Sequence, residues 1–298
     1  MLTVNDDQVV YSMGPKNFPV AEVNSGETLM FITKDCFSNQ IKSEGDLFES
    51  VGWATINPAT GPVAVKGAKP GDTLAVHIRD IETAEQGCMV TVPEMGAAGD
   101  IIRVSETKII NITDGRARFS DKISIPVDPM IGVIGTAPEK EDIPCGTPGR
   151  HGGNMDTRLI KKGNTIYLPV FVDGALLAMG DLHAVMGDGE VSVTGLEIPG
   201  KVTVKVDLIK EKSEPWPVLE SDDYWYVIAS GEDLDAAADL ALKAMLEFLG
   251  KRTDLSLNDR ISLLSACGNM EISQIVDPLK TIRFGISKTI MKNYDLRF

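Results

Sequence analysis

Through about residue 215, short apolar segments alternate with clusters of Gly, Pro, Asn and Asp. This spacing predicts many short strands in a sandwich or barrel rather than repeated β-α units. Segments 74–78 and 165–172 each follow such a turn cluster. In 202–208, apolar and polar residues alternate, as expected of a strand with one buried face. The shorter alternation in 191–194 predicts a further strand, with Glu190 at its start.

The pattern changes after about residue 222. Residues 224–229 predict one more strand, and apolar residues at helical spacing in 234–249 predict a helix, with a second helix beginning near Ser256. We therefore expect a mostly β (α+β) fold, with a β-sandwich or barrel-like body and a small C-terminal α/β part. The predicted domains are an N-terminal β-rich domain (1–125), a central β region with the candidate site (126–215) and the C-terminal part (216–298).

Charge and cysteine content narrow the function classes. The chain has 298 residues and a net charge of −14, which disfavours nucleic acids and anionic membranes as partners and favours a small neutral or cationic substrate. Its 4 cysteines are widely separated, without a CxxC pair or a disulfide framework, so we expect reduced thiols and a cytoplasmic location. No apolar stretch is long enough to predict a membrane span.

The chain has neither a GxSxG elbow nor a phosphate-binding loop. The sequence therefore gives no support to serine acyl-enzyme chemistry. Cysteine chemistry stays open as an alternative. Cys36 follows Asp35, and Cys145 lies six residues before His151. Such a nucleophile needs a thiolate and a nearby base, whereas an isolated cysteine is more often a small buried apolar residue.

Two glycine-rich segments carry polar residues at a spacing that suits ligand binding. In 152–156, Asn154 and Asp156 would point the same way if the chain is extended, and the same holds for Asp181 and His183 in 180–190. Glu190 closes the second segment. Taken alone, a segment of either kind is more often a turn. Residues 152–156 would then form a turn in which the Asn and Asp side chains cap their own backbone, and residues 180–190 would form an acidic hairpin.

A metal site built from these residues would combine histidine and carboxylate ligands. The chain has only 3 histidines, and His77 lies in an apolar strand where a structural role is expected. Zn²⁺ tolerates histidine with carboxylates, and Ca²⁺ remains possible for an oxygen-rich site. Shared ligation by Asp156 and His183 requires residues 175–180 to carry the chain back across the sheet. Their side-chain tips must then lie within about 8 Å.

Several ordered segments together resemble the acetamidase/formamidase family. They are 35–41 (DCFSNQI), 57–63 (NPATGPV), 131–138 (IGVIGTAP), 152–156 (GGNMD), 167–170 (YLPV), 180–190 (GDLHAVMGDGE) and 272–277 (ISQIVD). The resemblance implies a mostly β fold with a C-terminal α/β portion and hydrolysis of short amides such as formamide or acetamide. It also implies dimers or larger homo-oligomers, and a divalent metal in at least some members. Members associated with formamide have His-Pro-Gly where this chain has Asp128-Pro129-Met130, which leaves the preferred amide open.

Residue chemistry and the resemblance together give a working mechanism. Metal ligands would be Asp156 and His183, with Asp181 or Asp35, and Glu190 would be the general base.

Asn154 and Gln40 would position the amide or stabilise the oxyanion. Two rival hypotheses are a metal-free hydrolase using a cysteine and a non-catalytic β protein that binds a metal or small ligand.

Overall fold

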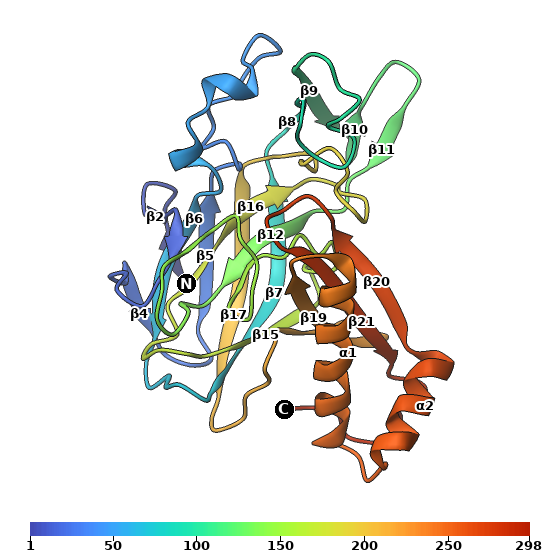
Figure 1. Ribbon diagram of the computed structural model, residues 1–298. Coiled ribbons are helices and arrows are strands. Elements are labelled where there is room, and N and C mark those ends of the chain that lie inside the picture. The colour runs from blue at the N-terminus through green and yellow to red at the C-terminus, as the bar shows by residue number, and fades with distance from the viewer.

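A computed structural model describes all residues 1–298 and consists mainly of strands, with two α-helices near the C-terminal end (Figure 1). The strands are β1 (Leu2–Val4), β2 (Val9–Val10), β3 (Ser12–Met13), β4 (Ala21–Val23), β5 (Thr28–Thr33), β6 (Ala59–Val65), β7 (Thr73–Thr83), β8 (Gln86–Thr91), β9 (Glu106–Thr113), β10 (Arg116–Arg118), β11 (Ser124–Pro126), β12 (Met130–Gly135), β13 (Ile143–Pro144), β14 (Gly152–Asn154), β15 (Thr165–Pro169), β16 (Leu177–His183), β17 (Gly200–Ile209), β18 (Val218–Glu220), β19 (Tyr224–Gly231), β20 (Asn269–Gln274) and β21 (Lys280–Ser287). The helices are α1 (Leu234–Gly250) and α2 (Leu257–Cys267), and two short 3-10 turns cover Phe48–Ser50 and Trp53–Thr55.

Two sheets form the body. The larger has nine strands in the order β1-β5-β17-β7-β15-β18-β19-β21-β20, and the second has six, in the order β14-β12-β16-β6-β2 with β4 against β6. The main apolar core contains residues of both sheets, including Phe31 of β5, Ile131 of β12 and Met179 of β16. In β17 every second residue is buried from Val202 to Val206, as its alternating sequence predicts.

The six-stranded sheet is covered on both faces. Every residue of β6, β12, β14 and β16 is buried, which agrees with their apolar and glycine-rich sequences. A charged residue on one of these strands therefore lies in the interior, where it needs a compensating partner.

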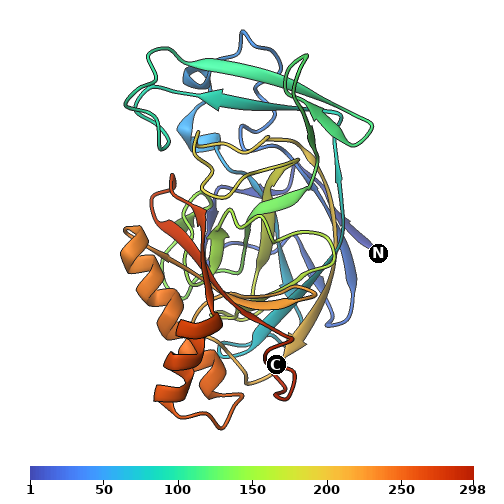
Figure 2. The ribbon, with the colours of Figure 1, turned by 90° about the vertical axis from the view of Figure 1, so that its right-hand side faces the viewer.

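A separate four-stranded sheet, β11-β10-β9-β8, lies at the top of the molecule in Figures 1 and 2. A small apolar cluster links this layer to the segment before β6, through Phe37 and Phe48 on one side and Cys88 and Val90 of β8 on the other. This four-stranded sheet, called the cap from here on, and the 3-10 segment, residues 48–55, thus form one wall over the six-stranded sheet.

The C-terminal part extends the nine-stranded sheet with β18 to β21, and α1 packs against β19 and β21 (Figure 2). Asp233 caps α1 by accepting a hydrogen bond from the Ala236 N–H at 2.8 Å, and Ser256 caps α2 in the same way. Both predicted helices are therefore confirmed. Neither is long and apolar enough to span a bilayer.

The predicted fold class is confirmed, since a β body of packed sheets carries a small helical C-terminal part. The strand expected at 191–194 is wrong, because this segment is a turn. Glu190 and Val193 have φ angles of 48° and 75°, and the Val193 N–H bonds to the Glu190 carbonyl at 2.9 Å. The nine-stranded sheet takes strands from all three predicted domains, whose boundaries stay predictions.

Candidate active site

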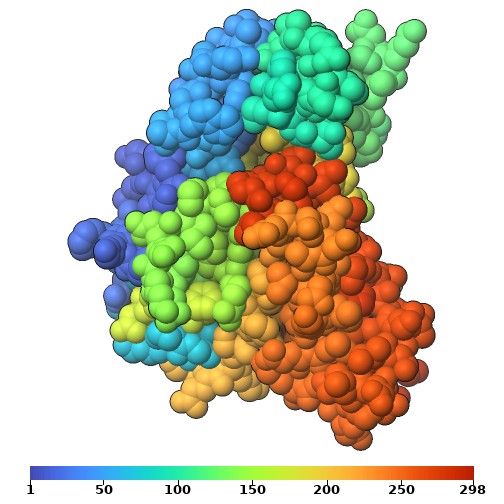
Figure 3. Space-filling model, in the orientation of Figure 1, coloured from blue at the N-terminus to red at the C-terminus, as the bar shows by residue number.

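A cavity of about 830 Å³ lies between the cap, the six-stranded sheet and the C-terminal part. Its polar lining includes Asn154, Asp181, Glu190, Glu197 and Asp277. These residues come from β14, β16, the loop between β16 and β17, and the turn between β20 and β21. In Figure 3, the blue segment near residue 50 and the blue-green segment near residue 100 lie above the red segment that precedes β21.

The strand order explains how distant residues meet. Strand β12 has β14 on one side and β16 on the other, with Val133 opposite Asn154 and Met130 opposite His183. Asp156 follows β14 by two residues, so it emerges beside the end of β16 that carries His183. Between them the chain visits β15 in the other sheet and returns through a turn at Ala175 and Leu176, both at positive φ. The predicted return across the sheets is thus confirmed.

His183 is the centre of the polar cluster. Its Nε2 atom lies 3.0 Å from Glu197 Oε1, 3.5 Å from Asp181 Oδ1, 3.8 Å from Glu190 Oε1 and 3.9 Å from Asp156 Oδ1. All five side chains are at most 4% exposed. Asp156 and His183 therefore satisfy the 8 Å requirement derived from the sequence.

Two glycines make room for this crowding. A Cβ atom on Gly132 of β12 would lie 2.5 Å from both Asp156 Oδ1 and Asp181 Oδ2. A Cβ on Gly195 would lie 2.6 Å from His183 Nδ1. Any larger residue at either position would displace a member of the cluster, because atoms cannot approach so closely without a shift.

Three carboxylates of the cluster have backbone angles that L-residues rarely adopt. The φ angles are 39° at Asp156, 55° at Asp181 and 48° at Glu190. The left-handed region costs a non-glycine residue about 1 to 2 kcal/mol, so the surrounding fold must hold these residues in place. Such conformations concentrate at functional sites.

Burial changes the acid strength of the cluster. It raises the pKa of Asp156 to about 7, with a further increase from Asp181, and that of Glu197 to about 8. Burial and the charge of Asp156 also raise the pKa of Glu190 and of Asp277 well above the ordinary range. For His183, burial lowers the pKa, but Glu197 and Asp181 outweigh it and raise the pKa well above its usual value. The acids can therefore be ionised together only beside additional positive charge.

The donor set fits a divalent cation. Both oxygens of Asp156, both ring nitrogens of His183 and Oε2 of Glu197 are buried without a hydrogen-bond partner. Neither Lys nor Arg forms an ion pair with Asp156, Asp181, Glu190 or Glu197. Ligands about 2 Å from a tetrahedral Zn²⁺ lie roughly 3.3 Å from one another, a spacing comparable with the distances around His183 Nε2.

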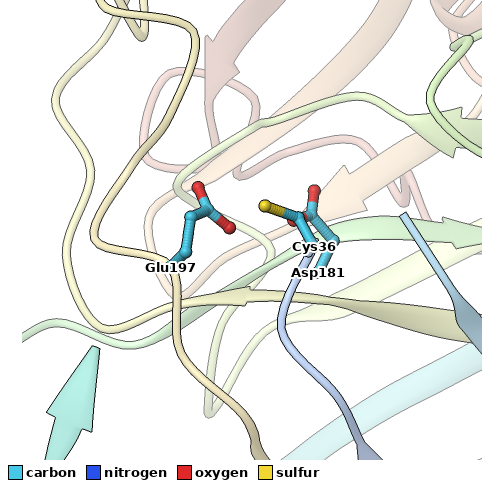
Figure 4. Close-up of side chains that lie close together, drawn as sticks. All are labelled: Cys36, Asp181 and Glu197. Atoms are coloured by element: carbon cyan, nitrogen blue, oxygen red, sulfur yellow. The ribbon is translucent and has the colours of Figure 1, made fainter. Parts of the chain in front are cut away.

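Two compact groups of donors can be distinguished within the cluster. Asp156, His183 and Glu190 have ligand atoms within 4.8 Å of one another, as do Cys36, Asp181 and Glu197. Figure 4 shows the second group, in which the Cys36 sulfur lies between the two carboxylates. Imidazole with carboxylates suits Zn²⁺, and the many oxygen atoms are also compatible with Ca²⁺.

Asn154, for which the sequence suggests a role in positioning the amide, lies at the cavity. It is 4% exposed, lines the cavity, and its Oδ1 atom has no hydrogen-bond partner. Its amide is therefore available to a polar ligand.

Gln40 and Asp35 lie elsewhere. Gln40 is exposed, and its Nε2 donates to the Phe37 carbonyl at 3.0 Å and to Thr55 Oγ1 at 3.1 Å, so the structure does not bring it to the cavity. Asp35 accepts hydrogen bonds from the N–H groups of Phe37 and Asn39. Burial raises its pKa to about 6, and it belongs to neither donor group. Asp35 thus shapes the loop that places Cys36.

Sequence reasoning did not single out two acidic residues that line the cavity. Glu197 lies between Leu196 and Ile198, and all three are at most 1% exposed, so a carboxylate inside an apolar segment was the available signal. Asp277 is the last residue of the stretch 272–277 that resembles the family, but only the fold shows that it lines the cavity. Its distance along the chain from Asp156 concealed the contact.

The other histidines lie outside the cluster. His77 in β7 contacts Thr165 Oγ1 and Asp207 Oδ2, each at 2.9 Å, which agrees with the structural role expected for it. His151 is 1% exposed, and burial lowers its pKa to about 4, so its ring is neutral at pH 7.

The thiols of Cys36 and Cys145 are poorly suited to nucleophilic chemistry, because their burial disfavours the thiolate. Burial raises the pKa of Cys145 to about 12. Burial, Glu197 and Asp181 together raise the pKa of Cys36 well above its usual value. A thiol nucleophile requires the opposite shift, so this geometry opposes the cysteine hypothesis.

Comparison with known proteins gives a consistent set of relatives. A model of the acetamidase/formamidase family matches residues 6–145 and 143–293. The crystal structure of an acetamidase from Bacillus halodurans is 47% identical, with a TM-score of 0.96 over 98% of this chain and 99% of the other. A predicted acetamidase/formamidase from Thermoanaerobacter tengcongensis is 48% identical, with a TM-score of 0.97 over 100% and 99%.

A more distant relative is the formamidase of Methylophilus methylotrophus. It is 24% identical over 265 residues, which are 69% of this chain and 65% of the relative. The chain thus spans less than two thirds of that curated relative's length.

Proposed function

This chain belongs to the acetamidase/formamidase family, and from that membership we propose that it is an amidohydrolase acting on short linear amides such as formamide and acetamide. The reaction adds the oxygen of water to the amide carbon, breaks the C–N bond and yields a carboxylate and ammonia. The observation that carries the proposal is the buried cluster of His183 and four carboxylates at the floor of a cavity.

Asp156 and His183, together with Asp181 and Glu197, would hold a divalent cation, Zn²⁺ in the first instance and Ca²⁺ as the alternative. The unpartnered donor atoms and the absence of a Lys or Arg counter-charge support this assignment. When bound, such a cation supplies Lewis-acid chemistry, because it lowers the pKa of water and polarises carbonyl oxygens.

Glu190 is the proposed proton carrier. Its carboxyl group lines the cavity, and its raised pKa makes proton uptake favourable near neutral pH. It takes the proton from water as the C–O bond forms and delivers it to the amide nitrogen as the C–N bond breaks. This delivery is necessary because the amide anion is a very poor leaving group.

Asn154 is proposed to orient the substrate. Its buried side-chain amide can pair with the carbonyl or the NH₂ group of a primary amide. A fixed donor aimed at the developing oxyanion stabilises charge in the transition state more than in the ground state.

Ammonia release from formamide and acetamide tests the proposal. Glu190→Gln removes the proton carrier, so kcat should fall by at least a hundredfold, while substrate binding is less affected. The matched control is His77→Gln, which alters a histidine outside the cavity and should keep most of the activity. A Glu190→Gln enzyme with normal kcat would contradict the assignment, and a wild-type protein without amidase activity would favour a binding protein.

Assembly and location are further proposals. The family suggests a homo-oligomer, which light scattering of the purified protein would test. The 4 free cysteines suggest a reducing compartment, which leads us to propose the cytoplasm.

A further inference from the structure

The cavity is much larger than the amides that define the proposed function. Its volume is about 830 Å³. Acetamide has the volume of roughly three liquid water molecules, on the order of 90 Å³. Cavities of about 300 to 1,000 Å³ usually enclose much larger ligands.

The cavity has both acidic and apolar lining residues. Asp181, Glu190 and Glu197 of the His183 cluster mark its polar end, and about half of the other lining residues are apolar. The apolar lining consists mainly of Phe37, Phe48, Trp53, Ile56, Val90 and Met95.

Three aromatic rings form a continuous row from this polar end to the surface. Cys36, next to Phe37, belongs to the same donor group as Asp181 and Glu197. The rings of Phe37 and Phe48 are 6.2 Å apart and those of Phe48 and Trp53 are 5.1 Å apart, both edge to face. Exposure increases along the row from 2% to 7% to 70%. A substrate whose reacting group lies at the cluster would therefore extend its remaining atoms along this row.

The charge of the lining restricts such a substrate further. Lys280 is the only basic residue that lines the cavity, and its Nζ donates to the Asp277 carbonyl at 2.6 Å. Four acidic residues lie at the polar end. A substrate tail with a carboxylate would be repelled, whereas a neutral apolar tail would bury the aromatic row.

We propose that the preferred substrates are primary amides with an apolar acyl group of about four to eight carbon atoms, such as hexanamide or phenylacetamide. This inference rests on the proposed amidase function and extends it. The amide group lies at the His183 cluster, and the acyl tail packs against Phe37, Phe48 and Trp53. The reaction is the same hydrolysis, with a longer carboxylate and ammonia as products.

The test is a series of kcat/KM values from ammonia release with acetamide, butyramide, hexanamide and phenylacetamide. Each methylene removed from water contributes about threefold to fourfold in binding. Since burial in the cavity is partial, hexanamide should exceed acetamide by at least tenfold. The gain should appear mainly in KM, because the tail contacts are present in both ground and transition states.

Two variants test whether the aromatic row contacts the acyl tail. Trp53→Ala and Phe48→Leu should each lower the ratio of hexanamide to acetamide kcat/KM by at least threefold. The control Phe18→Ala removes an aromatic ring that is 90% exposed and outside the cavity, and it should leave the ratio unchanged.

The outcomes separate the two proposals. If acetamide is hydrolysed but longer amides give no gain, or if neither wall variant changes the ratio, the acyl-tail inference is overturned and the amidase function stands. If no amide releases ammonia, the amidase function itself fails.

Discussion

At the scale of single residues, His183 defines the site because its Nε2 atom is surrounded by four carboxylate oxygens between 3.0 and 3.9 Å away. Burial raises the pKa of Asp156 and of Glu197, because the interior disfavours the ionised form of a carboxyl group that lacks enough positive charge nearby. A divalent cation would supply this charge, which links metal affinity to the protonation state of the cluster.

His151 gives a residue-scale prediction for stability. Burial lowers its pKa to about 4 in the folded protein, whereas an unfolded chain has the ordinary value near 6.5. The unfolded state therefore binds the proton first as the pH falls, and stability is lost between about pH 6.5 and pH 4. Between pH 7 and pH 5 this loss is about 2 kcal/mol in the free energy of unfolding.

Urea unfolding of the wild type and of His151→Gln at both pH values measures this contribution. The wild type should lose about 2 kcal/mol more than the variant between pH 7 and pH 5. Equal losses in the two proteins would show that His151 does not titrate as its burial indicates.

At the scale of elements, the site depends on β12 as a spacer between two strands that carry carboxylates. Asp156 follows β14 on one side, and Asp181 belongs to β16 on the other. Gly132 lies between them and leaves space for both side chains. The loop after β16 is held by Arg283 of β21, which donates two hydrogen bonds to Asp188 at 2.8 and 2.7 Å. Strand β21 of the nine-stranded sheet thus helps to fix Asp188, two residues before Glu190.

Gly132→Ala tests the spacer. The added methyl would lie 2.5 Å from two carboxylate oxygens, so Asp156 or Asp181 must move. We expect a loss of about 1 to 3 kcal/mol in the free energy of unfolding and at least a tenfold fall in kcat/KM for acetamide.

Gly187→Ala is the matched control, because a Cβ at that position meets nothing within 4 Å. It should keep both stability and activity. A Gly132→Ala protein with normal kcat/KM would show that the cluster tolerates displacement and does not act as the reaction centre.

The sequence predicted local structure well and long-range contacts incompletely. Periodicity located β17 and α1, because alternation and helical spacing are properties of adjacent residues. It failed at 191–194, where the turn bonds of Glu190 and Val193 override a strand-like alternation.

The same limit applies to the site. Asp156, His183 and Glu190 were recognisable from their chemistry and from the family resemblance. Gln40 was proposed from its segment, but its side chain turns back to the Phe37 carbonyl. Glu197 and Asp277 reach the cavity through strand order, which no single stretch of sequence specifies.

At the scale of the whole molecule, three parts of the chain enclose one cavity. Strand β16 supplies Asp181 and His183 of the cluster, Asp156 follows β14, and Glu190 and Glu197 come from the loop between β16 and β17. The cap and the 3-10 segment supply the apolar wall, and the turn before β21 supplies Asp277. We therefore propose that the protein is one catalytic unit whose centre would hold a divalent cation between His183 and its carboxylates.

Metal removal and restoration test this central claim most directly. Protein treated with a chelator should lose ammonia release from acetamide, and its Tm should fall by roughly 5 °C. Stoichiometric Zn²⁺ should restore both in the wild type but not in Asp156→Asn. Full activity and an unchanged Tm in protein shown by elemental analysis to be free of divalent metal would contradict the account.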